Sequence, residues 1–298
     1  MTETLSVFST QQHLKEFSAA YQSVLQQWTA PYEEKYIPTS FGETHVIVSG
    51  SEDAPPILFL HAFFATAAVW YPNAGALSQG YRTYAVDVLG EANLSRPTRP
   101  IKSIDEMIQW LIELLDGLGI QQTFLVGNSF GAFLCASLAM HLPQRVRGMV
   151  LIGPSATFKS ITPFYVHMFL PKMFGMLFPW FPWLPQIIQS SLEWMRNGLP
   201  ANPGWDELFY LCMMYGGNTN QIFPRVYKKE ELGKIITPTL LLIGDRERIY
   251  NPAETIRIAQ QAVPGLKAAI IPNAHHITAL AQPELVNQKI KDFFSSIQ

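Results

Sequence analysis

The sequence predicts an α/β protein with a mostly parallel eight-stranded sheet, helices on both of its faces and an inserted helical cap. Three observations lead to this prediction. Short continuous apolar runs, typical of strands buried on both faces, alternate with segments of helical periodicity. One of these runs is followed by G-x-S-x-G and an apolar helix. The alternation is interrupted once, by a long segment rich in aromatic residues, methionine and proline.

The first predicted elements are a helix and a hairpin. Residues 11–29 have apolar side chains at steps of three and four, which places these side chains on one stripe of an amphipathic helix. We expect this stripe to dock on the main body. Residues 35–37 and 45–48 flank a turn at Phe41-Gly42 and predict a β-hairpin.

Six further apolar runs predict the remaining strands: 56–60, 83–86, 123–126, 149–152, 239–243 and 268–271. Residue patterns that begin helices lie between these runs and after the last one. Ser103 precedes Glu106 in a capping-box pattern, Asn251-Pro252 opens a second helix, and Pro283 opens the last one. Strands separated by helices must run parallel in most of the sheet.

The long interruption, residues 159–235, predicts a helical cap inserted after the sixth strand, so that residues 1–158 and 236–298 form the core. Its most apolar part, residues 161–186, contains Lys172 and several prolines and is predicted not to span a membrane. A cap above a catalytic face must present some side chains to a pocket. The aromatic and methionine residues available for this are Phe164, Phe169, Met173, Phe174, Met176, Phe178, Trp180, Phe181, Trp183, Trp194, Trp205, Met213 and Met214.

The amino-acid composition limits which classes of function are expected. The 298 residues carry a formal net charge of −2, which gives no electrostatic argument for a nucleic-acid partner. The two cysteines, Cys135 and Cys212, are too few for a disulfide framework, and no Cys/His/Asp cluster has metal-ligand spacing. The first 30 residues lack the pattern of a signal peptide, so a cytoplasmic location is expected.

The pentapeptide Gly127-Asn128-Ser129-Phe130-Gly131 follows the run 123–126 directly and leads into an apolar helix. A serine on such a strand–turn–helix is the nucleophile elbow of a serine hydrolase. The turn is tight, so only glycine fits two residues before and two residues after the serine. Ser129 is therefore the predicted nucleophile.

A serine hydroxyl needs a base, and the base needs a third group to orient it. His275 and His276 both follow the last strand; α/β-hydrolases commonly have G-H there, seven residues before a proline, and counting back from Pro283 favours His276. Asp245 and Glu247 both follow the strand 239–243. The usual G-x-x-D spacing favours Glu247 as the acid, with Asp245 as the alternative.

The oxyanion hole needs two backbone donors aimed at one point. The N–H of Phe130, which follows the nucleophile, is one; the N–H of Phe63, in the loop after the third strand, is the predicted second. Ala62 stands where glycine is usual, and a positive φ there would distort the hole. His61 is expected to brace this loop. Phe64 and Asn128 are the candidate substrate-binding residues, beside cap aromatics that sequence alone does not assign.

The chain resembles the α/β-hydrolase superfamily and, more narrowly, the bacterial carboxylesterase NP group. The resemblance covers roughly residues 35–296 and is weakest through the cap. It rests on five segments: 41–47, 51–56, 70–73, 81–87 and 249–252. It implies a glutamate at the position of Glu247, while Ala62 and His275 depart from the glycines of the group.

We therefore predict a serine carboxylesterase that cleaves small hydrophobic esters through an acyl-enzyme and needs no cofactor or metal. An aspartate at the elbow would indicate a dehalogenase or epoxide hydrolase, and Ser129 argues against both. A lipase, a thioesterase, a lactonase or a carbon–carbon bond hydrolase are alternatives within the fold. A ligand sensor with slow or absent turnover is the alternative from another class.

Overall fold

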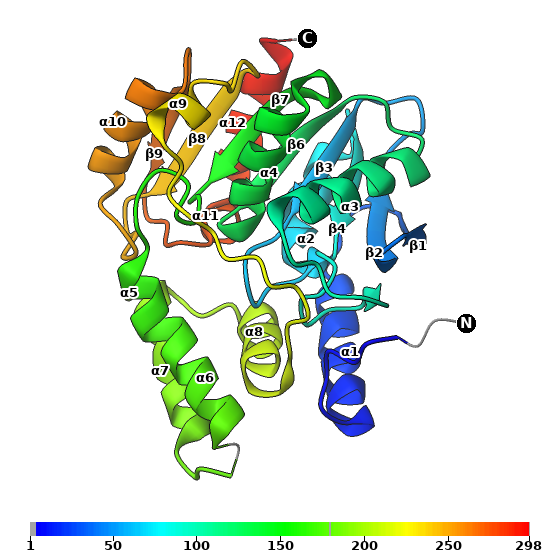
Figure 1. The fold of residues 1–298 in the computed structure, drawn as a ribbon, viewed down its shortest axis with the longest axis vertical. Coiled ribbons are helices and arrows are strands. Elements are labelled where there is room, and N and C mark those ends of the chain that lie inside the picture. The colour runs from blue at the N-terminus through cyan, green and yellow to red at the C-terminus, as the bar shows by residue number, and fades with distance from the viewer. Residues whose placement is uncertain (1–3, 179, 298) are drawn as a thin grey trace.

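A nine-stranded sheet forms the centre of the protein, with strand order β1-β2-β4-β3-β6-β7-β8-β9 and β5 paired with β2 (Figure 1). The computed structural model describes residues 4–178 and 180–297. The strands are β1 (Tyr32–Thr39), β2 (Gly42–Ser49), β3 (Pro56–Leu60), β4 (Arg82–Val86), β5 (Arg96–Pro97), β6 (Thr123–Asn128), β7 (Val146–Ile152), β8 (Thr239–Gly244) and β9 (Lys267–Ile271).

The predicted fold class is confirmed. Strands β3, β4, β6, β7, β8 and β9 pair in parallel, and β2 pairs antiparallel with β1, β4 and β5. All eight predicted strands are present. The ninth, β5, is two residues long, and no apolar run marks it in the sequence. Because the central strands are parallel, their carboxyl ends meet at one edge, where ligands bind in open α/β sheets.

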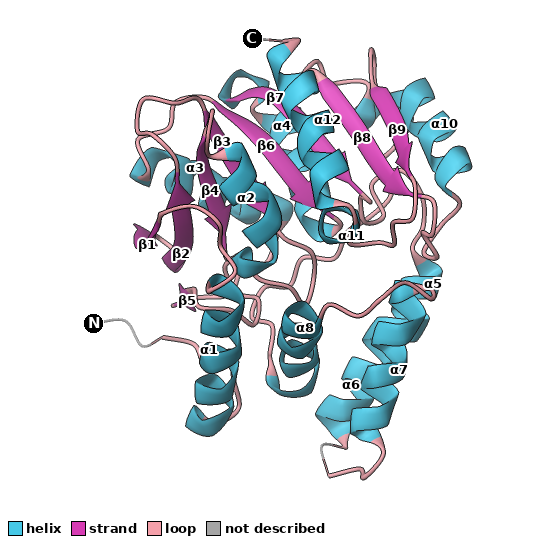
Figure 2. Ribbon diagram, turned by 180° about the vertical axis from the view of Figure 1, so that it is seen from behind, coloured by secondary structure: helices cyan, strands magenta, loops and turns pink. Residues whose placement is uncertain are grey.

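Helices cover both faces of the sheet. α3 and α4 lie on the face seen in Figure 1, and α2 and α12 lie on the opposite face, seen in Figure 2. The helices of the core are α1 (Gln11–Leu25), α2 (Tyr71–Leu77), α3 (Ile104–Gly117), α4 (Phe130–His141), α10 (Pro252–Ala262), α11 (Thr278–Ala281) and α12 (Pro283–Ser295). α4 is buried almost all round, which explains its uniformly apolar sequence.

The N-terminal helix docks as predicted. Phe17, Tyr21 and Val24 on its apolar stripe are buried, and the helix lies beside α8 in both ribbon views. It ends at Leu25, short of the predicted residue 29. Trp28 is nevertheless buried beyond its end, where the indole N–H donates to Ser49 Oγ at 2.9 Å.

The segment 159–235 interrupts the sheet between β7 and β8 and is mostly helical. Its elements are α5 (Thr162–Phe164), the π-helical turn η3 (Tyr165–Phe169), α6 (Leu170–Leu177), α7 (Leu184–Arg196), α8 (Pro203–Tyr215) and α9 (Lys229–Leu232). α6 and α7 pair and project away from the sheet (Figures 1 and 2). Pro179, at their connection, lies outside the described residues.

The most apolar part of this segment, residues 161–186, is predicted not to span a membrane, and the helices of the structure can be compared with that prediction. Among the described residues, no helix combines the length and the apolar character needed to cross a lipid bilayer. Lys172, the charged residue that interrupts the segment in sequence, is buried. Its ammonium group donates to the carbonyls of Cys212 and Met213 at 2.9 and 2.7 Å, at the C-terminal end of α8. The cation therefore satisfies carbonyls that the helix itself leaves unpaired.

Candidate active site

Ser129 lies on the turn between β6 and α4 with φ 52° and ψ −109°, a strained conformation for a residue other than glycine. Its backbone N–H donates to the Ile152 carbonyl at 2.8 Å, which ties the turn to β7. A Cβ at Gly131 would lie 1.9 Å from the Leu60 carbonyl oxygen, and a Cβ at Gly127 would lie 2.4 Å from the Gly131 carbonyl group. The two glycines therefore allow strand and helix to approach this closely.

His276 and Glu247 lie in the loops that follow β9 and β8, and their side chains are in contact. His276 Nδ1 is 2.7 Å from Glu247 Oε2, and Glu247 Oε1 accepts the Ile249 N–H at 2.9 Å. The carboxylate is thus held by the chain on one side and by the imidazole on the other. With Nδ1 donating to the carboxylate, Nε2 is left as the free, basic nitrogen of the ring.

Asp245, the alternative acid, has a different partner. Its Oδ1 accepts the Ala274 N–H at 3.1 Å, and the Arg246 N–H donates to the Ala274 carbonyl at 2.9 Å. These bonds fasten the β8 loop to the loop that carries the two histidines. Asp245 therefore braces the neighbourhood of His276, whereas Glu247 contacts its ring.

His275 has a different hydrogen-bond partner. Its Nδ1 accepts the Ile277 N–H at 3.1 Å, so the ring proton resides on Nε2. Burial, together with the adjacent His276, lowers the pKa of His275 to about 4. His275 is therefore a neutral side chain near neutral pH and adds no charge beside His276.

Ser129 and His276 are enclosed. Each exposes 2% of its surface, and His276 Nε2 is buried with no hydrogen-bond partner among the described residues. The Asn128 amide donates to the Ile152 and His276 carbonyls, both at 3.3 Å. Asn128, a candidate substrate-binding residue, thus ties the serine turn to the histidine loop. Gly153, which the sequence analysis did not single out, packs beneath His276: a Cβ there would lie 3.3 Å from Nδ1.

The loop after β3 contains the predicted oxyanion donor Phe63. The Ala65 N–H donates to the Ala62 carbonyl at 3.2 Å, which closes a turn with Phe63 and Phe64 at its centre. The positive φ of this turn, 58°, is at Phe64; Ala62 is not among the described non-glycine residues with positive φ. The position of Ala62 therefore does not require a positive φ, and alanine fits there.

His61 braces this loop. Its Nε2 accepts the Val88 N–H at 2.9 Å, so Nδ1 carries the proton and donates to the Ala62 carbonyl at 2.8 Å. Burial lowers the pKa of His61, which keeps the ring neutral and this tautomer in place. The Phe63 ring stacks on Phe130 at a centroid distance of 4.0 Å. The two backbone groups predicted to form the oxyanion hole thus belong to residues in direct contact.

Aromatic side chains from the segment 159–235 cover these residues. The Phe164 ring lies 6.3 Å from the His276 ring, between centroids. Phe169 contacts Phe63 at 5.6 Å and Phe64 at 5.5 Å, and Phe209 contacts Phe64 at 6.0 Å. Phe164 and Phe169 are among the aromatic residues that the sequence offers without an assigned role, because helical periodicity cannot tell which aromatics face the core.

His45 belongs to a buried network, although the sequence analysis gave it no partners. Its Nδ1 lies 2.8 Å from Asp87 Oδ2 and its Nε2 lies 2.9 Å from Glu34. Asp87 also accepts the Tyr21 hydroxyl at 3.0 Å and the Ala67 N–H at 2.7 Å. Burial opposes both charges, but mutual hydrogen bonds and attraction raise the pKa of His45 and lower that of Asp87. The pair joins α1 to the sheet, consistent with a structural role for Asp87.

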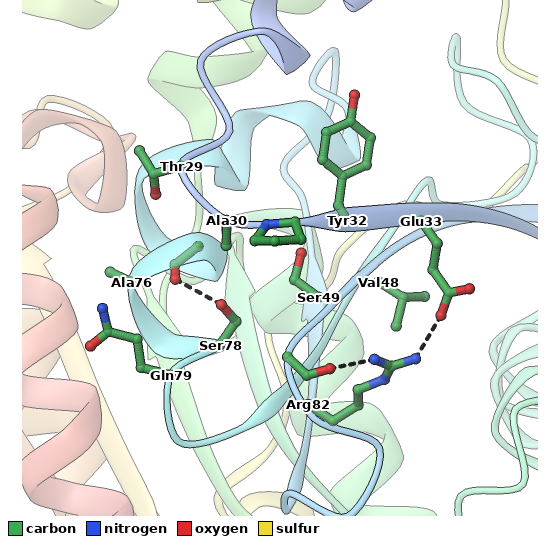
Figure 3. A pocket seen from close by; sticks show the side chains of 13 residues that line it. Thr29, Ala30, Tyr32, Glu33, Val48, Ser49, Ala76, Ser78, Gln79 and Arg82 are labelled. Carbon is green, nitrogen blue, oxygen red and sulfur yellow. Dashed lines mark hydrogen bonds and ion pairs between the residues drawn. The ribbon is translucent and has the colours of Figure 1, made fainter.

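A separate pocket of about 770 Å³ opens between the start of β1, β2 and α2 (Figure 3). Arg82 borders it, and donates to Glu33 at 2.6 Å. None of its lining residues is a candidate catalytic or oxyanion residue. Among the described residues there is also no group of three or more His, Cys, Asp and Glu side chains that could hold a metal ion.

Comparison with known proteins agrees with this architecture. A family model described as the alpha/beta hydrolase fold matches residues 55–197. An uncharacterized carboxylesterase, nap, of Bacillus subtilis (strain 168) is 34% identical over 283 residues, which are 93% of this chain and 91% of that protein. Carboxylesterase YbfK of the same organism is 32% identical over 290 residues, 93% of each chain.

A solved structure gives the same result. The crystal structure of naproxen esterase (carboxylesterase NP) from Bacillus subtilis superposes with a TM-score of 0.86 at 30% identity, and the match covers 96% of this chain and 99% of that one. The chain therefore belongs to the α/β-hydrolase superfamily, in the family that contains these bacterial carboxylesterases.

Proposed function

We propose that the protein hydrolyses carboxylic esters through an acyl-enzyme on Ser129. The contact of His276 Nδ1 with Glu247 at 2.7 Å is the observation that carries this proposal. It leaves a basic Nε2, buried and without a partner among the described residues, on the loop that Asn128 ties to the serine turn. The family relationship to named carboxylesterases supports the same reaction.

In the first half of the reaction, Ser129 Oγ attacks the ester carbonyl carbon while its proton passes to His276 Nε2. Glu247 stabilises the resulting imidazolium through Nδ1–H. The carbonyl oxygen becomes an oxyanion, which the backbone N–H groups of Phe63 and Phe130 bind. The N-terminal end of α4, where Phe130 is the first residue, adds its positive dipole at the same point.

In the second half, the tetrahedral intermediate collapses and the carbon–oxygen bond to the alcohol breaks. His276 gives its proton to the leaving alcohol, which departs. A water molecule then attacks the acyl-enzyme and gives its proton to His276. The second intermediate collapses to the free acid, and the proton returns to Ser129 Oγ. The cycle balances without a cofactor.

We infer that residues 159–235 act as a cap and that the substrate is hydrophobic. Phe164 of this segment contacts His276, and Phe169 and Phe209 contact Phe63 and Phe64 of the core. Such surroundings favour apolar or aromatic groups on the acid or alcohol side of the ester. The solved relative named naproxen esterase makes esters of aromatic acids the first candidates.

The test is hydrolysis of p-nitrophenyl esters of increasing acyl length by the native chain and by Ser129→Ala. We expect turnover by the native chain and a loss of at least about 10³-fold in the variant, with an unchanged thermal unfolding midpoint. Retention of activity by a folded Ser129→Ala variant would exclude the acyl-enzyme. Absence of hydrolysis by the native chain, with saturable binding of an ester, would favour the sensor function instead.

A second candidate function, action on esters at a lipid surface, is favoured by the exposed end of the α6–α7 hairpin. Trp180, Trp183 and Met176 expose 75%, 68% and 69% of their surface there. Exposed tryptophans suit a membrane–water interface. A rise in rate when a short-chain triacylglycerol passes its solubility limit, lost in a Trp180→Ser/Trp183→Ser double variant, would support it. A rate that saturates below that limit would support a soluble-ester hydrolase.

A further inference from the structure

Ser129 and His276 are closed to solvent in this structure. Each exposes 2% of its surface, and His276 Nε2, the proposed base, is buried. An ester carbonyl must contact Ser129 Oγ, and the proton of that hydroxyl must pass to Nε2. An ester can therefore reach the proposed reacting atoms only when some of the residues that enclose them move.

Phe169 is one of the enclosing aromatic residues, and it contacts both Phe63 and Phe64 of the predicted oxyanion loop. It is the last residue of the π-helical turn η3, which continues directly into α6. π-Helical turns are rare and occur frequently at functional sites. Because Phe169 immediately precedes α6, a displacement of α6 also displaces the Phe169 ring.

A buried lysine joins α6 to the end of α8. Lys172 lies three residues after Phe169 and is the only polar side chain of α6. Its ammonium group donates to the carbonyls of Cys212 and Met213 at 2.9 and 2.7 Å, and also to that of Gly216. An ammonium group has three N–H donors, one for each of these carbonyls. Lys172 thus uses its full donor capacity on the C-terminal end of α8.

The C-terminal end of α8 is itself fixed to the core, through the loop after β4. The Cys212 thiol donates to the Ala92 carbonyl at 3.3 Å. In the same loop, the buried Glu91 carboxylate accepts from the side-chain amides of Asn218 at 2.8 Å and Asn220 at 3.1 Å, just beyond α8. The hydrogen bonds of the lysine therefore tie α6 to a point that the core holds in place.

We propose that Lys172 is a positioning residue: it holds α6 closed, with the Phe169 ring against Phe63 and Phe64, and so limits the size of the ester that reaches Ser129. The proposal rests on the proposed function, because Ser129 selects among esters only if it reacts with them. When the ammonium group releases the three carbonyls, α6 and Phe169 can move away from the predicted oxyanion loop. Bulky esters depend on this movement more than small esters do.

The test compares Lys172→Met with Met173→Ala in the full-length protein. Methionine keeps the unbranched stem of lysine but removes all three donors, whereas Met173 is the next residue of α6 and exposes 53% of its surface. Each variant is labelled at Ser129 with a small and with a bulky fluorophosphonate, and intact-mass spectrometry over time gives the two rates. The ratio of the bulky to the small rate cancels the reactivity of Ser129, which both probes share.

We expect Lys172→Met to raise the bulky-to-small ratio about 5- to 30-fold, because α6 opens more often without its hydrogen bonds to a charged group. Met173→Ala should keep the native ratio. A native ratio in a folded Lys172→Met variant would overturn the proposal, as would an equal rise in Met173→Ala.

Lys172→Gln, which keeps an amide donor on a shorter side chain, repeats the test if Lys172→Met does not fold. We expect a rise in the same direction. Failure of both variants to fold would also overturn the proposal, because Lys172 would then support the whole fold rather than the position of one helix.

Hydrogen–deuterium exchange of the peptide covering residues 165–177 gives a readout that does not depend on Ser129. This peptide should exchange faster in Lys172→Met than in the native chain, while the peptide covering α4 exchanges at the native rate. Native exchange over residues 165–177 would contradict the proposal. If neither probe labels the native chain, the proposed function fails, and the exchange rates still decide whether Lys172 holds α6.

Discussion

Glu247 Oε2 lies 2.7 Å from His276 Nδ1, although the two residues belong to loops that follow different strands. Asp245, two residues before Glu247, instead accepts the Ala274 backbone N–H at 3.1 Å. Two carboxylates in one short loop thus have separate tasks: one orients an imidazole, and the other fastens the loop that carries it. This division gives the first prediction.

Glu247→Gln should lower kcat/KM by about 10³- to 10⁴-fold, because an amide cannot both hold the required histidine tautomer and stabilise its positive charge. Asp245→Asn should lower kcat/KM by less than about tenfold and reduce thermal stability instead. Steady-state kinetics and thermal unfolding of both variants provide the measurement. A larger kinetic loss in Asp245→Asn than in Glu247→Gln would reverse the assignment of the acid.

Gly131→Ala should prevent folding or lower the free energy of unfolding by more than about 3 kcal/mol. The added Cβ would meet the Leu60 carbonyl oxygen at 1.9 Å, a backbone atom that cannot move without disturbing β3. Gly80→Ala is the matched control, since nothing lies within 4 Å of its Cβ position. We expect the control to stay within about 0.5 kcal/mol of the native chain in denaturant unfolding. A well-folded Gly131→Ala variant would show that strand and helix can separate.

Phe169→Ala should make Ser129 react faster with a bulky fluorophosphonate, because it removes a ring that contacts both Phe63 and Phe64, and Ser129 exposes only 2% of its surface. Phe178→Ala removes an exposed ring at the C-terminal end of α6 and should leave the labelling rate unchanged. Intact-mass spectrometry over time measures both rates. Equal rates in the two variants and the native chain would mean that the reagent reaches Ser129 by a path that Phe169 does not cover.

The pH dependence of stability should differ between the native chain and Glu91→Gln. Burial of Glu91, in the loop after β4, raises its folded-state pKa from 4.5 to about 7, so the folded protein holds this proton more tightly than the unfolded chain does. Its contribution to stability is fully present below pH 4.5 and is lost as the pH rises through 7. Relative to the native chain, Glu91→Gln should therefore gain on the order of 1–3 kcal/mol between pH 4.5 and pH 8.

Denaturant unfolding at a series of pH values tests this difference. The titration of groups that do not interact with Glu91 is common to both proteins and cancels in the comparison. A difference in unfolding free energy that stays constant across the range would mean that Glu91 does not bind a proton in the folded state near pH 7.

The sequence alone determined the order of the strands along the chain and the position of the serine turn. Both depend on local patterns: continuous apolar runs mark strands buried on two faces, and G-x-S-x-G needs glycines where neighbouring backbone leaves no room for a side chain. Strand β5 was not predicted, because a strand of two residues has no periodicity. Helix α1 is shorter than its apolar stripe, because Trp28 packs beyond the end of the helix.

Only the tertiary structure decided which distant side chains meet. Spacing favoured Glu247 as the partner of the histidine and kept Asp245 as the alternative, and the packing of the β8 loop against the β9 loop brings Glu247 to the ring. A positive φ at Ala62 would have distorted the oxyanion hole, and the structure has the positive φ of this turn at Phe64 instead. The contacts of His45, Glu91 and Phe169 join segments far apart in the chain. Local sequence determines local conformation. Contacts between distant segments depend on how complete helices and strands pack, and no short stretch of sequence holds that information.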